Sequence, residues 1–315
     1  MPTVETVNGV VDVEGPGPDA HHEHFRTTDE ASRFQFPHLY DEEAEWEAAL
    51  ADANAVRSHG TTTVVEPSAM FLHRDAAFSR RVAEASGLTV ILATGIYTYD
   101  HLPQALRNRT EDQLAEVFVH DLEHGIQGTE IKPAFIKCAA DAPGLTPNIE
   151  KVHRAAARAS RQTGLPIMAH SRPASGTGPK QMRIFIEEGV EPAKVQVAHT
   201  GDTDDLASNA CSTQAVGSAS TATARHLSAH GAAQRHGPGA SGPGVRRPDV
   251  PGPGLLLDAR LVSARGAGLP EGPGGAEVVH DVPVRRGDPE LERRGMTTEQ
   301  LDQMMVSNPK RWLGS

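Results

Sequence analysis

The sequence predicts an α/β protein, a (β/α)8 TIM barrel, and three observations favour this fold. Apolar, β-branched segments alternate with amphipathic segments between about residues 20 and 200. The ends of the predicted strands recur every ~30 to 45 residues, which is the length of one strand-helix unit. Six such units leave room for two more in a chain of 315 residues. We therefore expect one domain over residues 1–315.

The predicted elements follow one another in order. A short segment at 19–25 contains the run HHEHF, and helices are expected over 41–60, 75–87, 110–128, 146–164 and in KQMRIFIEEGV. Thr110 is a good helix N-cap and Pro147 suits a first helical position. Strands are expected over 61–69, over 88–97, and in AFIKCA, PIMAHS and VQVAHTGD. Each strand is thus followed by a helix or a turn.

Composition excludes several classes of protein. The 30 Lys and Arg against 41 Asp and Glu give a net charge of −11, which argues against nucleic acid or an anionic membrane as partner. Two cysteines, Cys138 and Cys211, cannot form a disulfide framework, which favours a reducing compartment. No apolar run approaches ~20 residues, and the first residues lack the features of a signal peptide. We expect a cytoplasmic protein.

Lys137 stands in the middle of the apolar strand AFIKCA. Burying an unpaired ammonium costs several kcal/mol, so this lysine must be exposed at a strand end, neutral, paired or chemically altered. In a parallel barrel the chemistry lies at the carboxyl ends of the strands. His22, His24, Lys137, His170 and His199 all fall at such predicted ends, so we expect them to converge on one mouth.

These residue types suit a metal centre. Two strand residues that are separated by one position point to the same side, so His22 and His24 can both reach one ion. Imidazoles bind zinc and similar divalent ions, but four histidines alone do not hold two cations close together. A bridging anion is needed. A lysine that has captured CO2 becomes a carbamate, which supplies that anion and explains a lysine within an apolar strand.

Several motifs in this order resemble the phosphotriesterase family of the amidohydrolase superfamily, and within it the phosphotriesterase-like lactonases. They are HEH near residue 22, IKCA with Asp141 and PGLTP after the fourth strand, PIMAHS, and HTGDTDDL. VETVNGVVDVEG, the GIY of the third strand and MTTEQLDQMMVSNPKRWL fit the same family. The resemblance covers residues 4 to about 206 and resumes near residue 288.

The resemblance implies a binuclear centre. His22 and His24 would hold one ion and His170 and His199 the other, with carboxylated Lys137 bridging them and Tyr97 beside the centre. It further implies hydrolysis of lactones or organophosphate triesters by a metal-bridging hydroxide, with an eighth-strand aspartate accepting the proton. The metals expected are two divalent ions, zinc or else cobalt, manganese or iron. The partners expected are a small ester or lactone substrate and a second copy of the chain in a homodimer.

Residues 207–287 depart from the family. They contain no Ile, Phe, Tyr, Trp, Met or Lys and are rich in Gly, Pro and Ala, so units seven and eight are poorly encoded. We expect disorder there, and we offer a pair of compensating reading-frame shifts as a hypothesis. The eighth-strand aspartate lies in this region, where Asp258 is the best candidate ligand and base; Asp249 and Asp281 are worse placed.

Alternative interpretations remain at this point. The first is a catalytically impaired or inactive barrel that retains metal or ligand binding. The second is a mononuclear, deaminase-like amidohydrolase, which Lys137 disfavours. The run from His120 to His124 matches the inverted zinc-peptidase pattern H-x-x-E-H, but an outer helix with solvated polar residues explains it better.

Overall fold

The computed structural model describes residues 2–13, 19–21, 23–58, 60–199, 299 and 307–314. Its centre is a six-stranded parallel sheet in which the strands follow one another in sequence order, β3-β4-β5-β6-β7-β8. These strands are Asp19–His21, Thr63–Glu66, Thr89–Ile96, Phe135–Ala140, Ile167–Ser171 and Val195–Ala198. Sequential order with parallel neighbours requires every connection to cross on the same side, which curls the sheet as in a barrel.

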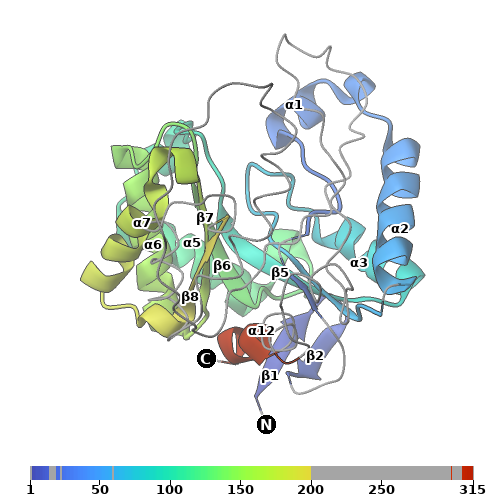
Figure 1. Ribbon diagram of the computed structural model, residues 1–315. Helices are drawn as coiled ribbons and strands as arrows, with labels where there is room; N and C mark the ends of the chain where they lie inside the picture. The colour runs from blue at the N-terminus through green and yellow to red at the C-terminus, as the bar shows by residue number, and fades with distance from the viewer. Residues whose placement is uncertain are drawn as a thin grey trace, which may run out of the picture.

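Helices cover the outer face of this sheet (Figure 1). The longer ones are α2 (Glu42–Ser58), α3 (Ala76–Ser86), α5 (Glu111–His124), α6 (Pro147–Thr163) and α7 (Thr177–Glu187). The shorter ones are α1 (Glu30–Gln35), α4 (Gln104–Arg107), α12 (Asn308–Leu313) and the 3-10 helices Pro37–Leu39, Ile126–Gly128, Pro173–Ser175 and Pro192–Lys194. A two-stranded antiparallel hairpin, β1 (Thr3–Thr6) with β2 (Gly9–Asp12), lies beside α12 at one end (Figure 1).

Helix limits follow the capping residues that the sequence contains. The Thr110 hydroxyl oxygen accepts a hydrogen bond from the Gln113 backbone N–H, and the Gln113 side-chain oxygen accepts one from the Thr110 backbone N–H. Helix α5 therefore begins with a complete capping box. Thr146 caps α6, which ends at the left-handed Gly164. The single helix expected over 110–128 is wrong at its end: Gly125 stops α5, and Gln127, at φ 56°, interrupts the helical geometry of the next turn.

Buried apolar side chains form clusters on both faces of the sheet. One cluster lines the concave interior and includes Val65, Ile91, Phe135 and Met168, which lie on adjacent strands. Trp312 from α12 closes this cluster, with its ring 5.4 Å from that of Phe135. Two further clusters join the convex face to the helices. Among the described residues, no helix is long and apolar enough to cross a membrane.

Candidate metal centre

Lys137 is completely buried in the middle of β6, where all six residues are buried. Gly95 of β5 lies opposite Lys137 in the parallel register. A Cβ atom on Gly95 would lie 1.9 Å from the Lys137 carbonyl oxygen, so only glycine permits the two strands to come this close. Of the alternatives left open for Lys137, exposure of its amine at a strand end is therefore excluded.

His170, the next-to-last residue of β7, and His199, which directly follows β8, lie together at the carboxyl ends of these strands. Their ring centroids are 4.3 Å apart. His170 is in register with Ala139 of β6 and Ala198 of β8, and these small neighbours leave room for its ring. Burial, helped by the nearby His199 and Lys137, lowers the pKa of His170 to about 3, even though the hydrogen bond to Asp141 raises it. His170 is therefore neutral near pH 7, which is the form that binds a metal.

Tyr97 and Asp141 complete this group. The Tyr97 hydroxyl donates a hydrogen bond to Asp141 Oδ2 at 2.7 Å and lies 3.3 Å from His170 Nε2. Asp141 Oδ2 also lies 3.1 Å from His170 Nε2. The hydrogen bond from His170 is the largest of the effects that hold the pKa of Asp141 far below its usual range. Burial, and then the bond to Asp141, raises the pKa of Tyr97.

Asp141 is a residue whose role the sequence analysis missed, although it lies within one of the motifs. Asp141 follows β6 directly, two residues after Ala139 and four after Lys137. Since side chains two residues apart along a strand point to the same face, the Asp141 side chain belongs on the face that carries Lys137. The rule that selected the histidines, polarity at the carboxyl end of a strand, would also have selected Asp141. Glu66, the last residue of β4, is a second polar residue that this rule would have found.

His24 lies near β4, and its Nδ1 is 2.8 Å from Ser68 Oγ and 3.2 Å from Glu66 Oε1. The expectation that the histidine pair sits within a strand is wrong for His24, because β3 ends at His21. The glycines and prolines of the segment EGPGPDA before it supply no apolar residues for a longer strand. His22 lies outside the described residues, so its approach to His24 stays a prediction.

Other predicted residues fall elsewhere. Asp249, Asp258, Asp281 and Cys211 lie outside the described residues, as does the whole stretch 207–287. His120 and His124 are exposed on α5 with ring centroids 4.5 Å apart. Within the described ranges there is no group of three or more His, Cys, Asp or Glu side chains that could hold a metal ion. His120 and His124 thus occupy a solvated helix face, as expected.

The sequence profile of the phosphotriesterase family matches residues 2–218. The chain belongs to the phosphotriesterase family. This confirms the resemblance, and it confirms the barrel, since the family has the TIM-barrel fold. The six described strands form the first part of that barrel.

Three relatives illustrate the range of the family. An aryldialkylphosphatase of Saccharolobus solfataricus is 45% identical over 185 residues, which is 59% of each chain. A phosphotriesterase homology protein of Mycobacterium tuberculosis is 36% identical over 215 residues, 65% of this chain and 66% of its own. A human N-acetyltaurine hydrolase is 28% identical over 155 residues, 49% and 44% of the two chains. The chain therefore matches less than two thirds of the length of these relatives.

Members of the phosphotriesterase family generally depend on two metal ions. The described part of this chain holds some of the donors that such ions need, a histidine pair beside a buried lysine. His170, which burial keeps neutral near pH 7, lies beside His199 and next to the buried strand that carries Lys137. A bound metal also needs each imidazole to be held at its second nitrogen, and both His24 and His170 have a carboxylate at one ring nitrogen.

Proposed function

We propose that this protein is a binuclear metal-dependent hydrolase that cleaves lactones, organophosphate triesters, or both. The observation that carries the proposal is the burial of Lys137, which has no exposed surface, on the strand next to the His170 and His199 pair. A lysine amine is costly in such a place, and its conversion to a carbamate would supply the anion that bridges two cations.

His22 and His24 would hold one ion, His170 and His199 the other, and carboxylated Lys137 would contact both. When bound, the two ions would supply an activated water at neutral pH and a Lewis acid for the oxygen of the ester. Elemental analysis of the purified protein should identify the ions as zinc, cobalt, manganese or iron.

The protein's own side chains do the positioning. Tyr97 is 7% exposed and its hydroxyl is directed by Asp141, so its ring offers a fixed wall beside His170, with centroids 5.1 Å apart. Such a wall limits the orientations of a substrate that enters at the mouth. Asp258 would accept the proton that the attacking water loses, if it occupies the eighth-strand position.

Metal content and hydrolysis, measured on the same purified sample, test the proposal. Wild-type protein should contain about two divalent ions per chain and should cleave a long-chain lactone or an aryl phosphotriester. An N-acyl amide belongs in the same panel, because some relatives are named N-acetyltaurine hydrolases. Lys137→Ala should lose the second ion, and bicarbonate should promote reconstitution of the wild type but not of this variant.

The matched control is Lys151→Ala, which removes a half-buried lysine of α6 whose amine donates to the Arg107 carbonyl. It should keep both ions and full activity. His120→Gln with His124→Gln removes the imidazoles of α5 that could add a loosely bound ion to the count. Wild-type metal content in Lys137→Ala would refute the bridging role.

The composition of residues 207–287 supports a second candidate, a catalytically impaired barrel that retains metal or ligand binding. The predicted proton acceptor lies in that stretch, which lacks the bulky branched residues of a barrel interior. One ion or none per chain, with no turnover of any substrate in the panel, would favour this candidate.

A further inference from the structure

We propose that Asp141 and Glu66 are positioning residues that decide which nitrogen of a metal-binding histidine faces the metal. Asp141 would hold the proton of His170 on Nε2 and so direct Nδ1 to the metal. Glu66, with Ser68, would hold the proton of His24 on Nδ1 and so direct Nε2 to the metal. The inference rests on the proposed function and adds a role for Asp141 and Glu66 toward the metal-binding histidines.

The contacts of Asp141 are consistent with only one tautomer of His170. Asp141 Oδ2 accepts the Tyr97 hydroxyl at 2.7 Å and lies 3.1 Å from His170 Nε2. If Nε2 carried a lone pair, it would face a carboxylate oxygen at hydrogen-bonding distance, which is repulsive. A proton on Nε2 instead forms a hydrogen bond to the carboxylate and also reaches the Tyr97 oxygen at 3.3 Å. The lone pair is then on Nδ1.

Asp141 is held firmly enough to impose this choice. Its other oxygen, Oδ1, accepts hydrogen bonds from the Ala142 backbone at 2.7 Å and from Arg172 Nη1 at 3.1 Å. The ring of His170 is anchored through its backbone as well, because Gln181 Nε2 donates to the His170 carbonyl at 2.8 Å. Both partners of the hydrogen bond are thus fixed before any metal binds.

Glu66 has the corresponding place next to His24. Its Oε1 lies 3.2 Å from His24 Nδ1 and accepts the Ser68 backbone N–H at the same distance. Ser68 Oγ lies 2.8 Å from the same ring nitrogen. Glu66 and Ser68 are almost fully buried, at 3% and 2% exposed. The Glu66 carboxylate oxygen can only accept, so it favours a proton on Nδ1, and the Ser68 hydroxyl can accept from the same proton.

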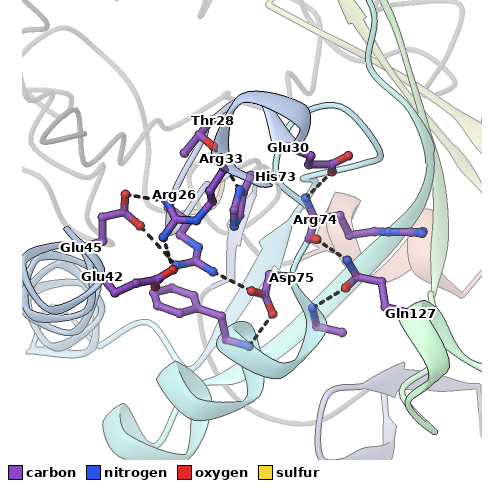
Figure 2. A network of polar contacts seen from close by, with 12 residues as sticks. Arg26, Thr28, Glu30, Arg33, Glu42, Glu45, His73, Arg74, Asp75 and Gln127 are labelled. Carbon is purple, nitrogen blue, oxygen red and sulfur yellow. Dashed lines mark hydrogen bonds and ion pairs between the residues drawn. The ribbon is translucent and has the colours of Figure 1, made fainter. Parts of the chain in front are cut away.

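The loop that carries Ser68 is held in place by a network of polar contacts (Figure 2). The Glu30 carboxylate accepts the backbone N–H groups of Phe71 and Arg74 at 3.0 and 3.1 Å. Arg26, which is 91% buried, donates to Asp75 at 2.6 Å, while the Gln127 side chain contacts the Arg74 carbonyl and the Ala76 N–H (Figure 2).

The same network lies close to Glu66. Residues of both groups, Arg26 and Asp75 on one side and Glu66 and Ser68 on the other, line one small cavity. A clamped loop leaves the carboxylate little freedom to follow a rotating imidazole. The ring must therefore adapt to the carboxylate, which is what a positioning role requires.

Nitrogen-15 NMR of the histidine rings in metal-free protein tests the inference directly. His170 of the wild type should carry its proton on Nε2 and His24 on Nδ1. Asp141→Ala should leave His170 as a mixture of tautomers, and Glu66→Ala should do the same for His24. The wild-type spectrum alone can contradict the predicted positions of the ring protons on His170 and His24. The inference can therefore be tested even if a variant fails to fold.

Zinc affinity, measured by competition with a chelator, is the second readout. Asp141→Ala and Glu66→Ala should each weaken zinc binding about tenfold to a hundredfold. The matched control is Asp100→Asn, which alters a carboxylate that accepts from Thr146 and Asn148 and contacts neither histidine. It should change neither the tautomers nor the zinc affinity.

The outcomes separate this inference from the proposed function. Wild-type protein that binds no zinc overturns the proposed function, whereas the tautomers can still be read from the metal-free rings. Zinc affinity that Asp141→Ala and Glu66→Ala leave unchanged, or a wild-type His170 protonated on Nδ1, overturns the positioning role alone.

Discussion

Gly95→Ala should damage both the stability of the protein and its metal centre, because Gly95 is where β5 and Lys137 meet. Its φ of +119° suits glycine, and a Cβ there would lie 1.9 Å from the Lys137 carbonyl oxygen and 2.9 Å from its backbone nitrogen. Since carbon atoms normally keep a contact distance of about 3.5 Å, the two strands would have to separate by roughly 1.5 Å.

The expected loss follows from two effects. Backbone strain at such a φ costs about 1 to 3 kcal/mol, and overpacking of a close contact typically adds about 1 to 3 kcal/mol. We therefore expect Gly95→Ala to reduce the free energy of unfolding by about 2 to 6 kcal/mol. Because Lys137 moves with the strand, metal content should fall as well.

Denaturant unfolding, with metal analysis of the same samples, measures both effects. Gly164→Ala is the matched control, since Gly164 also has a positive φ, +80°, but a Cβ there meets nothing within 4 Å. It should cost only about 1 kcal/mol and leave metal content unchanged. If the two variants were equally stable and bound equal amounts of metal, the close approach of β5 to Lys137 would not be as described.

Two further predictions concern pH and metal removal. His153 is fully buried, its Nδ1 donates to the Ile149 carbonyl, and burial lowers its pKa to about 4 from 6.5. The unfolded chain then binds the proton more readily, so stability is complete above about pH 6.5 and falls by about 3 kcal/mol as the pH drops to 4. When denaturant unfolding is measured across this pH range, the free energy of unfolding should fall less steeply with pH for His153→Gln than for the wild type. An equal fall in both proteins would contradict the lowered pKa of His153. Removing metal with a chelator should lower the Tm of the wild type more than that of Lys137→Ala, because the variant has one stabilising ion fewer to lose; equal shifts in thermal unfolding would argue against a Lys137-dependent site.

Much of the fold was predictable because the local signals agree with the tertiary structure. The strand expected over 88–97 is β5, and the helix expected over 146–164 is α6, since apolar period and capping residues define both. The strand containing Lys137 was equally clear. The hairpin of β1 and β2 was not predicted, because its four-residue strands carry little periodic signal and β2 is fully exposed.

The candidate site was predictable only where the residue type itself is diagnostic. A histidine at a strand end suggests a ligand, and a lysine among apolar residues suggests a special state. Asp141 and Glu66 carry no such signal, because carboxylates after strands are common in turns and caps. Their importance depends on distances across neighbouring strands, which the order of residues along the chain does not contain.

Trp312 has a consequence for how the protein is made. Its ring closes the interior beneath Phe135, two residues before Lys137, and its indole N–H donates to the Lys194 carbonyl at 3.2 Å. During synthesis the ribosome therefore releases β3 to β8 well before the residue that seals their base. A nascent chain paused after residue 199 would expose that apolar interior to chaperones. Water would be fully excluded from the surroundings of Lys137 only once translation had passed residue 312.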